Sequence, residues 1–176
     1  MSEAAASSET PLWRFTLRFY RQDGVADACI ALQDHCGVDV NLLLFLLWLA
    51  IGGRQLSVEA IKELDEAVRP WRELTIIPIR EVRRGLKGVR TLVEAGKQEA
   101  LRTEIKAIEL EAERLQQEAL YSRSLSSLLG REAETAAARA NIAAYEQTLT
   151  AAFPKPAVHC LLAAFAAIKH DNFAPR

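Results

Sequence analysis

The strongest chemical signal in this chain is a cluster of basic residues between positions 69 and 90. Seven residues of that stretch are basic and two are glutamates, and six of the seven basic residues are arginines. A guanidinium group offers several N–H donors in one plane, which suits paired contacts with carboxylate or phosphate groups. We therefore predict a surface that binds an anionic partner. We assign to it Arg72, Arg80, Arg83, Arg84, Lys87 and Arg90.

Two explanations of this basic cluster are open from the sequence alone. From Arg80 to Arg90 the basic residues recur at helical spacing on one side, so they would be able to bind RNA, an acidic protein or anionic lipid. Alternatively the chain neutralises them itself, because residues 97–134 carry eight glutamates against six basic residues. The first explanation makes the cluster a binding surface, whereas the second makes it part of the fold.

A second group of polar residues surrounds the junction of two expected helices. Asp27 and Asp34 are seven residues apart and so point to the same side of a helix, and other polar residues follow closely. Carboxylates and an imidazole at one corner would suit acid–base chemistry or ligand binding. The alternative is that the aspartates lie on the surface or pair with arginines. The residues assigned to this candidate pocket are Trp13, Arg14, Asp27, Asp34, His35 and Asn41.

The three cysteines suggest neither a metal site nor a disulfide framework. Cys29, Cys36 and Cys160 show no short chelating spacing, and an odd number leaves one thiol unpaired, which fits a reducing compartment. The first ten residues, MSEAAASSET, lack the basic and apolar regions of a secretory signal. We expect a cytoplasmic protein with no metal ligand, no cofactor and no catalytic residue that the sequence identifies.

The pattern of apolar residues predicts that helices position all of these groups. No segment alternates as a strand does, apart from the short β-branched run around residues 75–77, and no glycine-rich phosphate loop is present. Proline is expected to end or kink a helix at Pro70 and to kink the next one at Pro78. The predicted fold class is all-α, a helical bundle built round a buried leucine-rich helix.

The buried helix is predicted over the run Leu42–Ile51. This run is almost continuously apolar but too short to cross a membrane, which requires about 20 residues. Asp39 is expected to cap its start and the pair Gly52-Gly53 to end it. We therefore expect a core helix with Leu44, Phe45 and Trp48 fully inside.

A long helix with a heptad pattern is predicted between residues 97 and 122. Its apolar positions recur at alternating spacings of four and three residues, so it should pack along another helix, either as a projecting arm or folded back. The same seam, within residues 101–119, would support a homodimer. The seam consists of Leu101, Ile105, Ile108, Ala112, Leu115 and Ala119.

The predicted organisation has three parts. Residues 1–10 are expected to be disordered, residues 11–96 to form an N-terminal helical bundle, and residues 97–176 to supply the heptad helix and further C-terminal helices. We expect the last two parts to pack together as one domain.

Several motifs in the first half resemble a small bacterial protein family of unknown function. The resemblance lies mainly in residues 13–45, with WRFTL, GVADACIALQD and GVDVNLLLF, and in residues 71–87, with WR, PIR and RR-x-LK. It extends to about residue 120 and implies a proteobacterial, cytosolic protein. It transfers no catalytic residue.

Two functional hypotheses follow from these observations. The first is a non-enzymatic helical interaction protein that presents its basic helix or its heptad seam to an acidic partner, either a protein or RNA. The second is a small-molecule-binding or metal-dependent enzyme with a polar pocket around Asp27, Asp34, His35 and Asn41. Convergence of these four side chains on a cavity would favour the second hypothesis, whereas outward orientation or pairing with arginines would count against it.

Overall fold

A computed structural model describes residues 10–124 and 132–168, and every regular element in these two ranges is helical. The prediction of an all-α fold is therefore confirmed for the described residues. The segment expected to be disordered, residues 1–10, lies outside them except for its last residue. The helices are α1 (Pro11–Tyr20), α2 (Val25–Cys36), α3 (Val40–Ile51), α4 (Val58–Trp71), the π-helical segment η1 (Arg72–Ile76), α5 (Ile77–Gly85), α6 (Ala95–Ser124), α7 (Glu134–Leu149) and α8 (Lys155–Ala167).

Helix α3 is the centre of the hydrophobic core, as the sequence predicts. Asp39 caps it by accepting a hydrogen bond from the backbone N–H of Leu42, and every residue from Asn41 to Ile51 is buried. Other helices surround it, with α7 and α6 making the most extensive contacts. A helix covered in this way needs no polar face, which explains its continuous apolar sequence.

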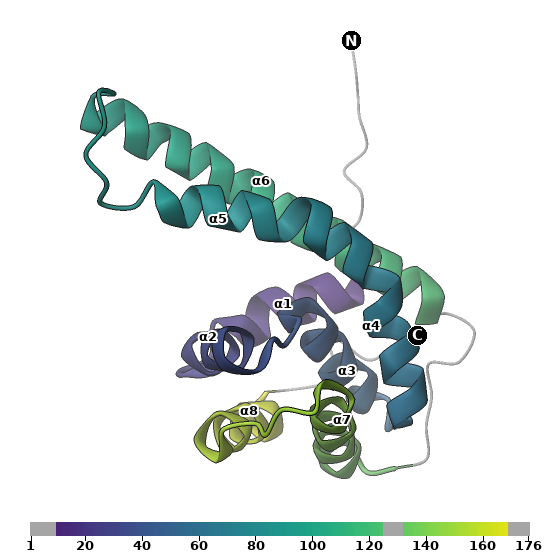
Figure 1. Ribbon diagram of the computed structural model, residues 1–176. Helices are drawn as coiled ribbons and strands as arrows, with labels where there is room; N and C mark the ends of the chain where they lie inside the picture. Colours follow the sequence, from purple (N-terminus) through teal and green to yellow (C-terminus); the bar gives the residue numbers. More distant parts are fainter. Residues whose placement is uncertain (1–9, 125–131, 169–176) are drawn as a thin grey trace.

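Helices α7 and α8 close the core from the side opposite the long helices (Figure 1). Helix α7 packs on α3 and α4, and α8 packs on α2. Ala137 and Ala138 on α7 are buried, and their small side chains permit close approach to α3. Asn141 connects α7 to α3 and to the turn that follows it, because its amide donates to the carbonyls of Leu46 and Arg54. The described residues therefore share a single core.

Helix α4 does not end at Pro70. It continues through η1 into α5, so that one long helical rod runs from Val58 to Gly85. Pro78 lacks the N–H that would bond to the carbonyl four residues earlier, and the wider turns of η1 lie immediately before it. A π segment changes the rotation of the helix, and Arg72, at its start, turns toward the core. The rod therefore absorbs both prolines without a break.

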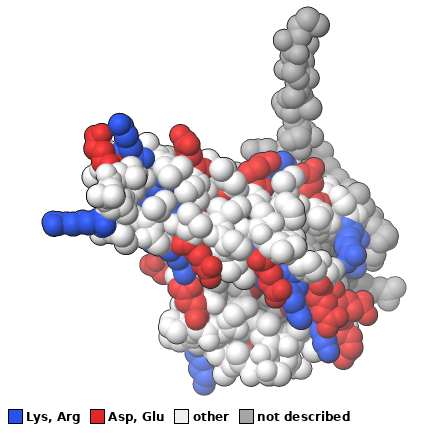
Figure 2. Space-filling model, turned by 45° about the horizontal axis from the view of Figure 1, so that its top comes forward, with Lys and Arg blue, Asp and Glu red and all other residues white. Residues whose placement is uncertain are grey.

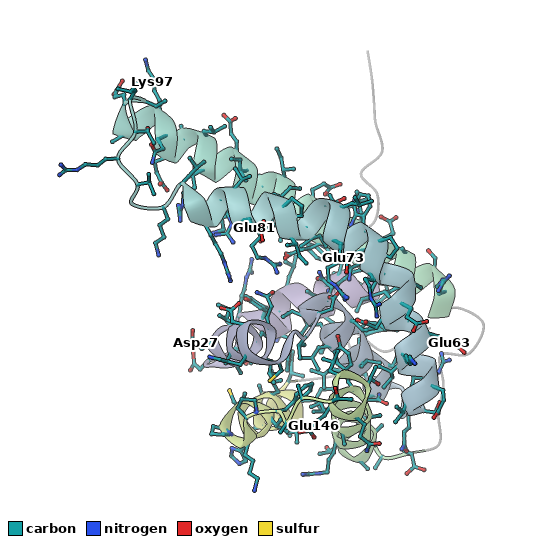
Figure 3. The ribbon with its side chains drawn as sticks, in the orientation of Figure 1. Asp27, Glu63, Glu73, Glu81, Lys97 and Glu146 are labelled. Carbon is teal, nitrogen blue, oxygen red and sulfur yellow. The ribbon has the colours of Figure 1, made fainter. Side chains whose placement is uncertain are left out.

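The rod and helix α6 form an antiparallel arm that extends beyond the body (Figure 1). The indole N–H of Trp71 donates to the carbonyl of Ala112 at 3.0 Å, and Gln98 donates to the carbonyls of Leu86 and Val89 near the free end. Lys97 lies at that free end (Figure 3). The visible face of the arm is largely uncharged between the charged residues at its end and margins (Figure 2).

The heptad seam of α6 is only partly covered by the rod. Ala112 is buried and Ile105 is half-buried, whereas Leu101, Ile108 and Leu115 have exposed fractions of 50%, 57% and 41%. Ala119 is also exposed, so at least one of the two apolar positions of each heptad faces solvent. No helix among the described residues is both long enough and apolar enough to span a membrane.

Candidate functional site

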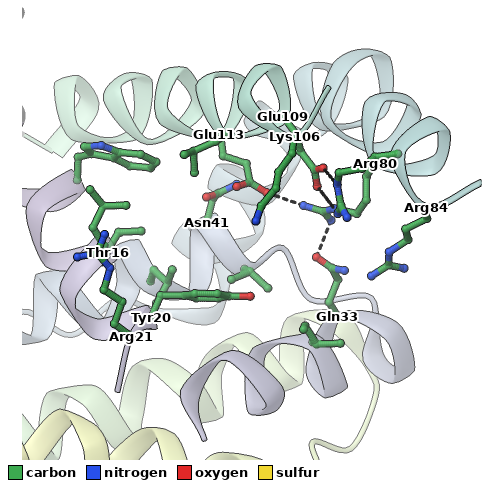
Figure 4. Close-up of a pocket in the computed structure, with 17 residues that line it drawn as sticks. Thr16, Tyr20, Arg21, Gln33, Asn41, Arg80, Arg84, Lys106, Glu109 and Glu113 are labelled. Carbon is green, nitrogen blue, oxygen red and sulfur yellow. Dashed lines mark hydrogen bonds and ion pairs between the residues drawn. The ribbon is translucent and has the colours of Figure 1, made fainter. Parts of the chain in front are cut away.

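A cavity of about 330 Å³ lies where the arm crosses the body (Figure 4). Helix α3 contributes its first turns, α1 and α2 form the walls on the body side, and α5 with α6 cover it from the arm side. Leu44 and Val40 are apolar lining residues from α3, and Trp13 is one from α1. The polar lining residues are Thr16, Tyr20, Arg21, Gln33, Asn41, Arg80, Arg83, Arg84, Lys106, Glu109 and Glu113.

Arg80 lies at the centre of the polar side of the cavity and is fully engaged within the chain. Its guanidinium donates to Glu109 at 2.8 Å, to Glu113 at 2.6 Å and to the side-chain oxygen of Gln33 at 2.5 Å. Arg83 makes a paired contact with the two carboxylate oxygens of Glu109. Burial alone would raise the pKa of Glu109, but hydrogen bonds from Arg83 and Arg80 outweigh this effect and hold that pKa below its usual value.

These ion pairs correct the picture of an open basic stripe. The second explanation of the basic cluster, neutralisation by glutamates of the heptad helix, describes Arg80 and Arg83, and the more exposed Arg84 lies 3.4 Å from Asp34. Lys87 and Arg90 are exposed near the free end of the arm and have no ion pair among the described residues. The predicted stripe is therefore divided between the cavity and the arm's free end.

Arg72, also assigned to the basic surface, instead joins two buried carboxylates away from the cavity. Its Nη1 atom lies 2.9 Å from Asp39 and 2.8 Å from Asp65, and the side chain of Gln116 also donates to Asp39 at 2.7 Å. The backbone N–H of Asp39 donates to the hydroxyl of Tyr145. This network connects α3, the rod, α6 and α7, so the role of Arg72 is structural.

Most of the predicted polar pocket does not form. Arg14, Asp27 and His35 are exposed and do not line the cavity, and Asp27 points away from the body (Figure 3). Asp34 is exposed and paired with Arg84. Helix α2 directs Ala28, Cys29 and Leu32 toward the core, which turns the opposite face outward. Of the predicted set, only Trp13 and Asn41 line the cavity.

The structure identifies lining residues that sequence reasoning missed. Tyr20 and Arg21 come from the end of α1, and Lys106, Glu109 and Glu113 come from α6. Glu109 and Glu113 are four residues apart and so share one face of a helix, and the glutamate content of residues 97–134 was the available signal. Nothing in the sequence indicated that this face would meet α1.

The cavity lining has no histidine and no cysteine, and no three His, Cys, Asp or Glu side chains among the described residues gather as metal ligands would. Cys29 is buried in the core beneath α2, whereas Cys36 and Cys160 are half-buried. The side chains that line the cavity offer hydrogen bonds and charge.

We expect Cys29 to resist alkylation in the folded protein. Burial raises the pKa of the Cys29 thiol to about 12, so the reactive thiolate is scarce at neutral pH. Iodoacetamide should label Cys36 and Cys160 first, and mass spectrometry of tryptic peptides over time would give the order. Equal labelling of all three in urea is the control, and early labelling of Cys29 in the native protein would contradict its buried position.

The fold and the site define an all-α protein with one core, a projecting helical arm and a polar cavity at the base of that arm. The chain belongs to the family DUF2390, described as a protein of unknown function, whose sequence profile matches residues 11–120. That match covers α1 to most of α6, and so includes every residue that lines the cavity. Neither the curated proteins nor the solved structures contain a significant match to this chain.

Proposed function

We propose that this protein is a helical interaction protein whose arm pairs with the arm of a second copy in antiparallel orientation. The observation that carries the proposal is the distribution of exposed apolar side chains. Thirteen large apolar residues are exposed in the described part of the chain, and eleven of them lie between Trp71 and Leu115. A concentration of exposed apolar side chains in one part of a molecule is typical of protein interfaces.

The open half of the heptad seam supplies the interface. Leu101, Ile108 and Leu115 are seven residues apart and therefore form one line along α6. At 100° per residue, Ile108 lies about 200° around the helix from Leu110, which lines the cavity. The open seam thus faces away from the body, where a second helix has access to it.

A second copy suits this line because the line is symmetric about Ile108. In an antiparallel pair, Ile108 would meet its own counterpart, and Leu101 would meet Leu115 of the partner subunit. Pairing of this line with its own counterpart would remove these three apolar side chains of each copy from water.

The ion pairs of Arg80 and Arg83 count against the alternative in which the basic helix binds RNA or an acidic protein. Their charges already have carboxylate partners within the chain. Lys87 and Arg90 have no ion pair among the described residues and lie toward the end of the arm. Only these two of the six assigned basic residues therefore stay open to such a partner.

We expect Ile108→Asp to convert a dimer into a monomer without loss of stability. Ile108 is exposed in the single chain, so a carboxylate there costs nothing until a second apolar surface covers it. Ile105→Asp should instead lower the free energy of unfolding, because Ile105 is half-buried in the single chain. Light scattering after size-exclusion chromatography gives the mass of each variant. Urea denaturation gives its free energy of unfolding, calculated for the oligomeric state that the variant has.

Ala107→Asp is the matched control, since Ala107 is an exposed neighbour that lies off the open seam. It should stay dimeric. Replacing Ile108 by cysteine should produce a disulfide-linked dimer under mild oxidation, whereas the same replacement at Ala107 should not. A wild-type chain that is monomeric at every soluble concentration, or equal masses for Ile108→Asp and Ala107→Asp, would refute the pairing.

A further inference from the structure

The cavity beneath the arm contains hydrogen-bond donors without partners. Asn41 is only 7% exposed, and its oxygen accepts a hydrogen bond from Gln117, whereas no hydrogen bond of its amide nitrogen occurs within the described residues. The hydroxyl of Tyr20 and the ammonium group of Lys106 also have no protein partner in that part of the chain. All three line the same space (Figure 4). Because Asn41 lines the cavity, a ligand or water there can supply the acceptor that its amide lacks.

The acceptors around the cavity are in contrast mostly occupied. Both carboxylate oxygens of Glu109 accept from arginines, the side-chain oxygen of Gln33 accepts from Arg80, and one oxygen of Glu113 does the same. Burial raises the pKa of Tyr20, so its hydroxyl keeps its proton and remains a donor at neutral pH. The hydrogen-bonding groups of the site that lack a partner are therefore mostly donors, and they suit a ligand that accepts hydrogen bonds.

The charge of the lining favours an anion. Five lining residues are basic and two are acidic, and Arg21 and Lys106 form no ion pair among the described residues. Burial raises the pKa of Glu113 in spite of its contact with Arg80, which makes protonation of this carboxylate easier when a second anion approaches.

The remaining lining residues are apolar and limit the size of the ligand. Trp13, Leu17, Leu44 and Leu110 provide a surface for a ring or a short hydrocarbon chain. A volume of about 330 Å³ lies at the lower end of the range of roughly 300–1,000 Å³ that ligand pockets occupy. The site thus suits a compact molecule with one apolar part and one acceptor-rich end.

We infer that the cavity between the arm and the body binds a small organic oxyanion, with its apolar part against Trp13 and Leu44 and its carboxylate or phosphate group on Asn41, Tyr20 and Lys106. The ligand would connect α3 to α6 and so fix the arm on the body. This binding does not depend on pairing of the arms, because the open seam lies on the opposite side of α6.

Isothermal titration with a series that keeps the apolar part constant tests the inference. The probes are 3-phenylpropanoate, the phosphate ester of 3-phenylpropanol, 3-phenylpropanamide and 3-phenylpropylamine, with hexanoate as an aliphatic acid. At least one oxyanion should bind saturably, with the amide at least about tenfold weaker and the amine weaker still, since the charged acceptor is lost. Comparison of the carboxylate probe with the phosphate probe identifies the preferred head group.

Two variants locate the binding. Asn41→Asp keeps an oxygen that accepts from Gln117 but replaces the free amide donor by an anion. Lys106→Gln removes the cation, and because Lys106 is exposed this substitution should leave the fold intact. Each variant should weaken binding of the oxyanion by about tenfold or more. Lys97→Gln, at the far end of the arm, is the matched control and should bind normally. If Asn41→Asp fails to fold, the affinity of Lys106→Gln for the oxyanion alone tests the inference.

Binding of none of the oxyanions, equal binding of the amide, or unchanged affinity in Lys106→Gln would overturn the inference. The mass of each variant, measured as for Ile108→Asp, separates this outcome from failure of the arm pairing. A protein that binds the oxyanion as a monomer would support the cavity and refute the dimer.

Discussion

Arg72→Met is expected to lower the free energy of unfolding by about 3–5 kcal/mol, because it leaves two buried carboxylates without their shared cation. Asp39 and Asp65 are each 5% exposed, and both lie within 3 Å of the same guanidinium nitrogen. Methionine preserves most of the apolar volume of the side chain. The lost free energy of unfolding therefore comes from the charge network and not from a cavity. Urea denaturation followed by circular dichroism measures it.

Arg69→Met provides the comparison for this measurement. Arg69 also contacts Asp65, at 3.3 Å, but its side chain is half-exposed, and exposed ion pairs contribute at most about 1 kcal/mol. We therefore expect a large effect at position 72 and a small one at position 69. Similar small effects at both would mean that Gln116 and the start of α3 satisfy Asp39 without Arg72.

Phe45→Ala is expected to cost about 3–5 kcal/mol, through lost apolar burial and the cavity that remains. Phe45 is buried on α3 and stacks near Trp48, with 6.2 Å between ring centroids. Trp48 in turn contacts Tyr121 of α6, so the substitution would also weaken packing at the base of the arm. Chemical denaturation gives the value.

Phe45→Leu is the conservative counterpart and should cost much less, since it keeps most of the buried volume. Val82→Ala, on an exposed part of the arm, should have little effect on the stability of the single chain. A loss below about 1 kcal/mol for Phe45→Ala would contradict the central position of α3 in the core.

Local sequence determined the helices and the core helix of this protein. Asp39 caps the start of α3 by accepting a backbone hydrogen bond, as its position in the sequence predicts, and Ser57 does the same for α4. The apolar run of α3 predicted its burial, because a helix without a polar face is stable only when other helices surround it. These features depend on residues within a turn or two of each other.

The sequence was less informative where the outcome depended on which helix each face meets. It predicted that Pro70 would end or kink its helix; the helix does not end there but continues through η1 into α5, which runs in a different direction from α4 (Figure 1). It predicted a heptad seam, but only part of that seam packs on the rod, and the rest of the inner face of α6 carries polar residues such as Glu109 and Gln116. Periodicity identifies which residues share a face, and it does not identify the partner of that face.

The candidate site shows the same division. Sequence reasoning found the arginines as one group and Trp13 and Asn41 as part of another. It included Asp27 and His35 in that second group, although neither lines the cavity. Arg80 meets Glu109 across 29 positions of sequence, and Thr16 donates to Gln117 across 101. Only the tertiary structure decided that the arginines turn inward and that a cavity forms beside them, because the path of the arm over the body is set by the packing of all the helices together.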